Sequence, residues 1–294
     1  MKTLKSPDGV VVEKFDDIYE FSDTIASRPQ NPLFKGKYSS QCEGDKSWYG
    51  TDTYAEADHL LQFGYEQGVQ AINSVASILG NEDEHLIRVA PIGQVPHVPN
   101  FIAGVPCNMI YKQRVARPKK VINIFFDRGV AYSVSSEEIT TASARLLDLV
   151  EFLERRGYSV NLEVGDSSVF KNCKYCFSSD EIRTVRILSI KIKDGRTNST
   201  NRRKVAYLLV HPSFSRRHVF KWMETHPDLD PSSDVHSYGY ALYGGLRTFE
   251  KRRQFYIDHG VITKDDYYFD IPALRKLSSS DEILPLLNEQ SRIA

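Results

Sequence analysis

The first residue whose type and position could do chemistry is Asp127, which follows the apolar run VINIFF at 121–126. Ligands of open α/β sheets bind beyond the carboxyl ends of parallel strands, so an Asp at such an end can belong to a metal or phosphate site. Ser133 and Ser135 follow closely and would add hydroxyl oxygens. The alternative is structural, because a strand-end Asp commonly accepts hydrogen bonds from nearby backbone amides. We favour the structural interpretation.

A second candidate is the C-x-x-C pair formed by Cys173 and Cys176. Such a pair can be half of a zinc site or a redox couple. A structural zinc needs four ligands, and the other two cysteines, Cys42 and Cys107, are distant along the chain. We therefore expect the pair to be buried as small apolar side chains, with zinc as the alternative.

The histidines do not complete a catalytic set. His211 and His218 lie in the stretch HPSFSRRHVF, but no serine occupies a Gly-x-Ser-x-Gly motif and no His-Glu-x-x-His occurs. Neither a Gly-x-Gly-x-x-Gly nor a Gly-Lys-Ser/Thr signature is present, which argues against a nucleotide-binding loop. An enzyme is not the favoured interpretation, and no cofactor is expected.

Charge is concentrated in one region. Residues 183–221 contain eleven Lys or Arg and one acid, Asp194. Such a region can neutralise phosphates without reading a base sequence. Its candidate contacts to nucleic acid or another polyanion are Arg183, Arg186, Lys191, Lys193, Arg202, Arg203, Lys204, Arg216 and Arg217. Two structural alternatives stay open, since lysines protect exposed edge strands and acids elsewhere can pair with these residues.

The elements that position Asp127 are the clearest in the chain. Residues 121–126 read as a strand covered on both faces. Ser135 then caps a helix with Glu138 at the capping-box position, and Gly157 ends it. The stretch YSVNLEV resumes at once with a period of two. Strand, helix and strand with short connections predict a βαβ unit.

We predict an α/β protein with a mostly parallel central sheet, flanked by helices, at residues 115–225. Residues 1–114 form a helix and loop region and residues 226–294 a helical region, both packed on this core. Within the core, TVRILSIKIK and VAYLLV are expected as strands, and Ser213 as the N-cap of a following helix. Residues 90–108 read as an irregular segment whose apolar side chains are expected to be buried: Val95, Val98, Phe101, Ile102 and Val105.

Composition narrows the class of protein. Lys plus Arg and Asp plus Glu are equal at 38 each, and 41% of residues are hydrophobic, as in ordinary globular proteins. No apolar run approaches 18 residues and the N-terminus has no apolar signal core, so no membrane partner is expected. Four scattered cysteines favour a reducing cytoplasm.

The order strand, Asp, small residues and helix resembles the von Willebrand factor A domain. The metal site of that domain follows an Asp-x-Ser-x-Ser pattern after its first strand. Here Asp127 matches the first position, whereas Gly129 and Ala131 replace both serines. The resemblance implies a Rossmann-like scaffold that commonly serves as a binding platform.

Longer stretches resemble a family of uncharacterised bacteriophage and prophage proteins. They are SWYGTDTYAEADHLLQFG, VPNFIAGVPCNMI, the βαβ stretch beginning INIFFDRG, and HPSFSRRHVF, which together span about residues 48–220. The resemblance implies a phage-encoded protein in the host cytoplasm and brings no catalytic residues with it.

Three functions follow from these observations. The favoured one is a non-enzymatic interaction protein that binds a host or phage protein. The second is a nucleic-acid-associated protein that uses the basic region 183–221. The third is a metal-dependent hydrolase centred on Asp127. The oligomeric state is not predicted.

Overall fold

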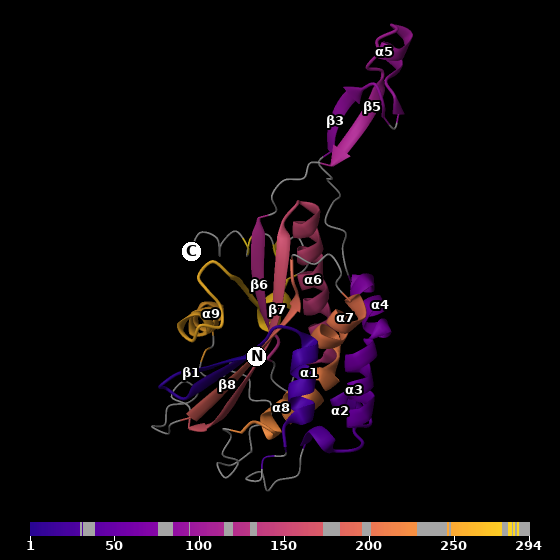
Figure 1. Cartoon of the computed structure of the whole chain (residues 1–294). Coiled ribbons are helices and arrows are strands. Elements are labelled where there is room, and N and C mark those ends of the chain that lie inside the picture. Colours follow the sequence, from indigo (N-terminus) through magenta and orange to yellow (C-terminus); the bar gives the residue numbers. More distant parts are fainter. Residues whose placement is uncertain are drawn as a thin grey trace.

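The computed structural model describes residues 1–29, 31, 39–75, 85–93, 95–114, 120–129, 134–172, 183–195, 201–227, 246, 248–277, 282, 283, 285 and 287. These residues form a six-stranded sheet with helices on both faces and a separate three-stranded sheet (Figure 1). The strands are β1 Lys2–Lys5, β2 Val10–Phe15, β3 His85–Ala90, β4 Val95–Pro96, β5 Met109–Arg114, β6 Val121–Asp127, β7 Ser159–Asn172, β8 Arg183–Lys193 and β9 Tyr267–Asp270. The α-helices are α1 Ile18–Ser27, α2 Lys46–Tyr49, α3 Tyr54–Phe63, α4 Glu66–Val75, α5 Val98–Ile102, α6 Ser136–Arg155, α7 Arg202–Val210, α8 Phe220–Glu224, α9 Phe249–Asp258 and α10 Ile271–Leu274, with a 3-10 turn η1 at Ser39–Gln41 and a π-helix η2 at Phe214–Val219.

The large sheet has the strand order β1-β2-β8-β7-β6-β9. Three neighbouring pairs are parallel, namely β2 with β8, β6 with β7, and β6 with β9. Two pairs, β1 with β2 and β7 with β8, are antiparallel. The predicted α/β class and the sheet flanked by helices are therefore confirmed. The sheet was predicted as mostly parallel, and it is mixed, with three parallel and two antiparallel pairs.

Strands β1, β2 and β9 come from the regions that the sequence assigns to the two flanking additions, so these additions are not purely helical. β9 has only four residues, YYFD, and three of them are buried. So short a run carries too few residues to show a period of two. Its aromatic side chains indicate burial, but only pairing with β6 makes it a strand of the sheet.

The predicted βαβ unit forms as expected. β6 leads through α6 to the parallel strand β7. The side chain of Ser135 accepts a hydrogen bond from the backbone of Glu138, and the Glu138 carboxylate accepts from the backbone of Ser135, which completes the capping box. Gly157 follows the helix at φ 89°, a left-handed conformation that glycine adopts at low cost.

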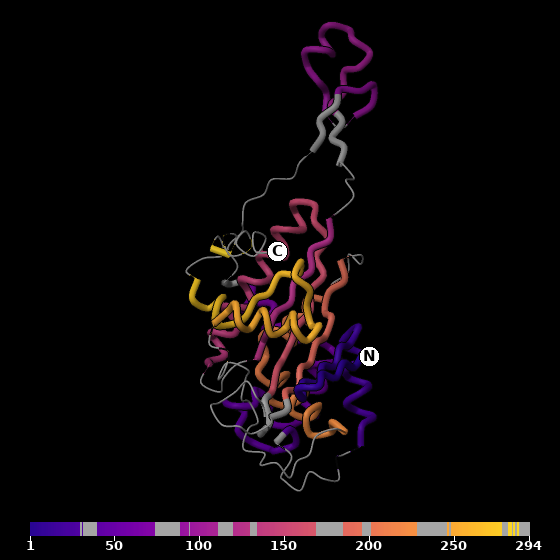
Figure 2. Tube along the Cα trace, turned by 90° about the vertical axis from the view of Figure 1, so that its left-hand side faces the viewer, coloured from indigo at the N-terminus to yellow at the C-terminus, as the bar shows by residue number. Residues whose placement is uncertain are grey.

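The sheet has a hydrophobic core on each face. On one face, Ile124 and Phe126 of β6 pack with α6, α7 and the start of α10. On the other, Phe125 of β6 packs with Tyr256 of α9 and with Tyr268 of β9. Figures 1 and 2 show α9 on one side of the sheet, and Figure 1 shows α6 and α7 on the opposite side. β6 is therefore an interior strand covered on both faces, as predicted.

The stretch VAYLLV, predicted as a strand, belongs instead to helix α7. Asn201 caps this helix, since its side chain accepts from the backbone N–H of Lys204. Residues 205–210 are all buried, because α7 lies beneath α3 and α4 and also contacts α6. An apolar run that is buried on every side carries no helical period, so periodicity cannot distinguish it from a buried strand. None of the described helices is long and apolar enough to cross a membrane.

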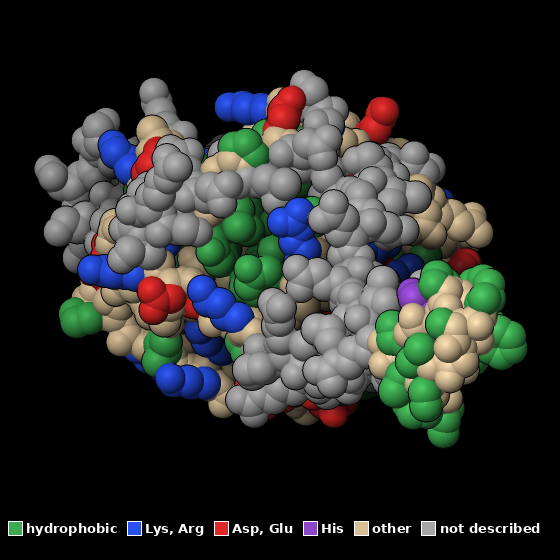
Figure 3. Space-filling model, turned by 90° about the horizontal axis from the view of Figure 1, so that it is seen from above, with side chains coloured by type: hydrophobic (Ala, Val, Ile, Leu, Met, Phe, Trp, Pro, Cys, Tyr) green, Lys and Arg blue, Asp and Glu red, His purple; other side chains and the backbone are tan. Residues whose placement is uncertain are grey.

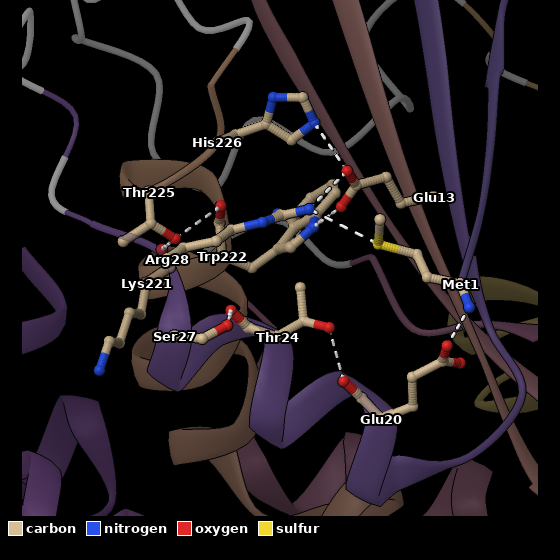
Figure 4. Close-up of polar contacts among 10 residues, drawn as sticks. All are labelled: Met1, Glu13, Glu20, Thr24, Ser27, Arg28, Lys221, Trp222, Thr225 and His226. Carbon is tan, nitrogen blue, oxygen red and sulfur yellow. Dashed lines mark hydrogen bonds and ion pairs between the residues drawn. The ribbon is translucent and has the colours of Figure 1, made fainter.

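A buried carboxylate fastens the N-terminal strands to the far end of the helical layer (Figure 4). Glu13 of β2 accepts hydrogen bonds from Arg28 Nη2 at 2.7 Å and from Trp222 Nε1 at 2.6 Å. His226 Nε2 lies 3.3 Å from Oε1, the carboxylate oxygen that also accepts from Arg28. Burial by itself would raise the pKa of Glu13, but the hydrogen bonds from His226, Arg28 and Trp222 outweigh it and lower the pKa to about 2.

The small sheet and α5 form an arm at residues 85–114 that projects from the rest of the molecule, here called the body (Figure 1). Its strand order is β3-β5-β4, and both neighbouring pairs are antiparallel. The predicted burial of its apolar residues is wrong, since Val95, Val98, Phe101, Ile102 and Val105 are exposed. The arm is too small to enclose these side chains, and the body does not cover them.

Candidate functional site

The carboxyl ends of β6 and β9 form the place where an α/β fold most often builds a site. Asp127 at the end of β6 is the register partner of Asp270 at the end of β9. The chain leaves β6 through α6 and β9 through α10, which pack on the same face of the sheet, whereas α9, which precedes β9, covers the other face. The site is considered because ligands of open α/β sheets bind beyond the carboxyl ends of parallel strands.

Asp127 itself is fully buried. Its Oδ1 accepts a hydrogen bond from the backbone N–H of Gly129 at 2.9 Å, and its Oδ2 lies 3.2 Å from the hydroxyl of Tyr268. Burial, reinforced by the neighbouring charge of Asp270, raises the pKa of Asp127 to about 7. The contact with Gly129 is the local backbone bond expected of a strand-end Asp.

Asp270 is held by a buried cation. Both Nε and Nη2 of Arg252, in α9, lie within 2.9 Å of Asp270 Oδ2. The other oxygen, Oδ1, accepts from the backbone N–H of Ala273 at 2.7 Å and so caps α10. The guanidinium of Arg252 thus supplies, within the fold, the positive charge that this pair of carboxylates requires.

The residues at this edge do not fit a divalent cation. Gly129 and Ala131 offer no side-chain oxygen, and the hydroxyl of Ser135 is engaged in capping α6. A hard cation needs several oxygen ligands, and the guanidinium of Arg252 already occupies Asp270. Within the described residues, no three His, Cys, Asp or Glu side chains come close enough to hold a metal. The remaining metal candidates, Ser133, Cys173 and Cys176, lie outside the described residues.

On the face of the sheet that α6 and α7 cover, Arg128 connects the end of β6 to the end of α7. Its Nε donates to the carbonyl of Leu209 at 3.1 Å and its Nη2 to the carbonyl of His211 at 2.6 Å. Its Nη1 lies 3.1 Å from Ser215 Oγ, which in turn donates to Asp166. Burial lowers the pKa of Arg128 to about 10. Burial also raises the pKa of Asp166 to about 6, although Arg128 and Ser215 favour its charged form.

The pair His211 and Ser213 resembles a nucleophile and its base in distance only. Ser213 Oγ lies 2.6 Å from His211 Nδ1 and 3.0 Å from the hydroxyl of Tyr207. The backbone N–H of Ser213 also donates to Nδ1, so this imidazole caps the following helix, which Ser213 was expected to do. Ser213 is fully buried, so a substrate would not reach its oxygen. Burial lowers the pKa of His211 to about 4, far from that of a general base at neutral pH.

Two of the predicted polyanion contacts lie inside the fold. Arg186 of β8 and Arg217 of η2 are both buried. The guanidinium of Arg217 donates to the hydroxyl and carbonyl of Thr51, at 2.9 Å and 2.8 Å. It also donates to the carbonyls of Ser40 and Cys42, at 3.0 Å and 2.8 Å. Arg217 therefore clamps the segment between η1 and α3 onto η2.

Most of the other basic residues contact acidic or aromatic side chains. Lys193 pairs with Glu154 of α6 at 2.7 Å, and Arg202 pairs with Glu151 of the same helix at 2.7 Å. Arg203 pairs with Glu66 at 2.5 Å. The ammonium of Lys204 lies over the ring of Tyr19 in α1. The guanidinium of Arg216 stacks on Trp48, 4.6 Å from the ring centroid, and donates to its carbonyl. Lys191 is half-buried, and the side chain of Arg183 is outside the described ones.

The arm carries a feature that the sequence analysis missed, namely a cluster of exposed apolar side chains. Ile92 is 82% exposed, Ile102 80% and Phe101 64%. Seen from above, hydrophobic side chains surround the end of the arm (Figure 3). Residues 89–110, here called the tip, contain no Asp, Glu, Lys or Arg, and this run without charge was the sequence signal available. Large exposed apolar clusters mark interaction surfaces.

The chain matches the family model described as "Domain of unknown function (DUF7192)" over residues 2–288. It belongs to this family. The match runs through the arm as well as the body, so the arm is part of the family's domain. No curated protein and no solved structure matches the chain.

Proposed function

We propose that this DUF7192 protein acts by binding rather than by catalysis, with the arm as its contact element and the α/β body as its base. The observation that carries the proposal is the exposed apolar tip. Three large side chains, Ile92, Phe101 and Ile102, are more than 60% exposed on an element that the body does not cover. Contact with a partner would remove them from water, and each buried Val, Leu, Ile or Phe contributes about 1.5–3 kcal/mol.

The carboxyl edge of the sheet supports the non-catalytic half of the proposal. The carboxylates of Asp127 and Asp270 are bonded to Gly129, Tyr268 and Arg252 within the fold. A catalytic acid or base has to reach its substrate, whereas both carboxylates are fully buried. A metal-dependent hydrolase centred on Asp127 is therefore poorly supported.

The scaffold and its origin remain part of the proposal. The order strand, Asp127 and helix α6 supports a von Willebrand A-like scaffold, although a fold alone does not imply a function. The stretches that resemble bacteriophage and prophage proteins support a phage-encoded protein acting in the host cytoplasm. Nucleic-acid binding by the region 183–221 is less well supported, because Arg186 and Arg217 are buried and Arg202 and Arg203 are paired with acids.

Site-specific photo-crosslinking tests the proposal in cells that produce the protein. A photoreactive amino acid replaces Phe101 in the arm or, as a matched control, Phe63 of α3, which is 63% exposed on the body. We expect a discrete adduct at position 101 and none at 63. The adduct, whether protein, nucleic acid or lipid, is then identified by mass spectrometry. Equal labelling at both positions, or no adduct at 101, would overturn the proposal.

A further inference from the structure

We propose that the surface contacted by the arm is the headgroup region of an anionic lipid bilayer, into which the tip inserts. This inference rests on the proposed function and names its partner. Four observations carry it: the distribution of exposed apolar side chains on the arm, the bonding of the tip backbone, the sign of the charges in the arm, and the lack of a second apolar cluster among the described residues of the body.

The exposed apolar side chains lie on several sides of the tip, an arrangement that the fluid interior of a lipid bilayer can cover. Ile92, Val98, Phe101 and Ile102 are each more than half exposed, and hydrophobic side chains lie on several sides of the tip (Figure 3). A protein partner would need a deep pocket to cover such a convex element. A bilayer closes around it, because lipid chains adapt to the shape that enters them.

Several backbone groups of the tip are already bonded within it. The backbone N–H of His97 donates to the carbonyl of Asn108 at 2.7 Å. The backbone N–H of Val105 donates to the carbonyl of Asn100, whose side chain donates to the carbonyl of Cys107, both at 2.9 Å. Four positions have no N–H because they are prolines: Pro91, Pro96, Pro99 and Pro106. Internal bonding lowers the cost of moving a backbone out of water, which is the main barrier to membrane entry.

The charges of the arm have the sign that anionic lipid selects. Residues 85–114 contain no Asp or Glu and three Lys or Arg. Arg88, Lys112 and Arg114 lie in β3 and β5, on the body side of the tip, since Arg88 is the register partner of Tyr111 and His85 that of Arg114. The acids 82–84 precede the arm and lie outside the described residues. An apolar tip backed by cations binds anionic bilayers through burial and charge together.

The same charges argue against a second copy of this chain. On the body, the described large apolar side chains that are exposed are scattered: Met1, Tyr19, Phe63 and Val121. Among the described residues, the other arm is therefore the apolar surface that a second copy would offer. Contact along the whole length of two arms would bring together three cations from each arm and no acid. A short hairpin tip is neither a membrane-spanning segment nor a signal peptide, so it can contact lipid although the sequence predicts neither of these.

Vesicle flotation with the full-length protein tests the inference. Phosphatidylcholine vesicles are compared with vesicles in which about a third of the lipid is phosphatidylglycerol, at low and at high salt. We expect the wild type to float with the anionic vesicles and less so at high salt, where charge is screened. The double variant Phe101→Ser/Ile102→Ser should bind about tenfold more weakly or worse, because its apolar burial is lost. The control Phe63→Ser should bind as the wild type does.

Insertion is measured separately from adsorption. In a Phe101→Trp variant, the tryptophan emission should shift to the blue when anionic vesicles are added. Brominated lipid chains should quench this emission more than they quench that of the wild type, which has two native tryptophans. The lipid inference is overturned if the wild-type protein does not float with anionic vesicles. It is also overturned if the variant Phe101→Ser/Ile102→Ser floats as well as the wild type does.

Two further outcomes separate this failure from that of the proposed function. A protein adduct at position 101 without vesicle binding would leave the arm as a contact element and give it a protein partner. A wild-type dimer that the double variant converts to a monomer, measured by light scattering, would assign the arm to a second copy. Either result would overturn the lipid inference and would leave the proposed function, binding through the arm, in place.

Discussion

Asp127 and Asp270 are register partners on adjacent parallel strands, and the hydroxyl of Tyr268 lies 3.2 Å from the first carboxylate and 3.1 Å from the second. One hydroxyl has a single hydrogen, so it donates to only one of the two. Arg252 balances the charge of Asp270, whereas burial raises the pKa of Asp127 to about 7. A protonated Asp127 would donate to Tyr268, which would donate to Asp270.

This arrangement predicts a pH-dependent stability that Asp127→Asn removes. The folded pKa of Asp127, about 7, lies above its ordinary value of 3.8, so its contribution is complete below pH 3.8 and is lost as pH rises to 7. Asn imitates the protonated carboxyl. Between pH 4 and pH 8, the free energy of unfolding of the variant should rise relative to that of the wild type by as much as about 4 kcal/mol. Chemical denaturation at each pH measures this difference. The exposed control Asp265→Asn should follow the wild type, and parallel curves for Asp127→Asn would contradict the prediction.

The buried charge of Glu13 predicts the opposite dependence of stability on pH. Its folded pKa of about 2 lies below the ordinary 4.5, so its contribution is present above pH 4.5 and is lost as pH falls towards 2. Glu13→Gln should be less stable than the wild type at neutral pH, and the difference should shrink by about 3 kcal/mol as the pH approaches 2. Thermal unfolding across this range measures it, with Glu250→Gln on the exposed face of α9 as control. A difference that does not change with pH would refute the assigned role of the charge.

Arg217 should be more important for stability than for binding. Replacement by Lys keeps the charge but cannot reach Thr51, Ser40 and Cys42 together, which leaves buried carbonyls without donors. We expect a loss of about 2–4 kcal/mol, since each unsatisfied buried group costs about 1–3 kcal/mol. Arg203→Lys, at an exposed pair with Glu66, should cost less than about 1 kcal/mol. Equal losses in urea titrations of the two variants would contradict the clamp.

The triple variant Arg202→Glu/Arg203→Glu/Lys204→Glu tests the basic region. These residues already contact Glu151, Glu66 and Tyr19, so we expect weak retention of the wild type on DNA and RNA and little change in the variant. Retention is measured at low and at physiological salt, because phosphate contacts weaken steeply with salt. Tight, salt-sensitive retention that the variant abolishes would instead establish nucleic-acid binding.

Local signals in the sequence were enough for part of the fold. The unit β6–α6–β7 follows from an apolar run, the capping box of Ser135 and Glu138, and Gly157, all close together along the chain. The position of Asp127 at a strand end follows from the same unit. Thr53 likewise caps α3, with its side chain accepting from the backbone of Glu56 three positions on. Such features depend on residues a few positions apart, which a sequence displays directly.

Tertiary structure alone decided the rest. Residues 205–210 are apolar throughout, so only their position beneath α3 and α4 determines that they form a helix. Arg217 looks like one basic residue among many until the segment at 40–51 folds over it. The tip residues Phe101 and Ile102 look like core until the arm projects away from the body. In each case the deciding quantity is which distant segments meet, and burial and charge pairing follow from that contact rather than from local pattern.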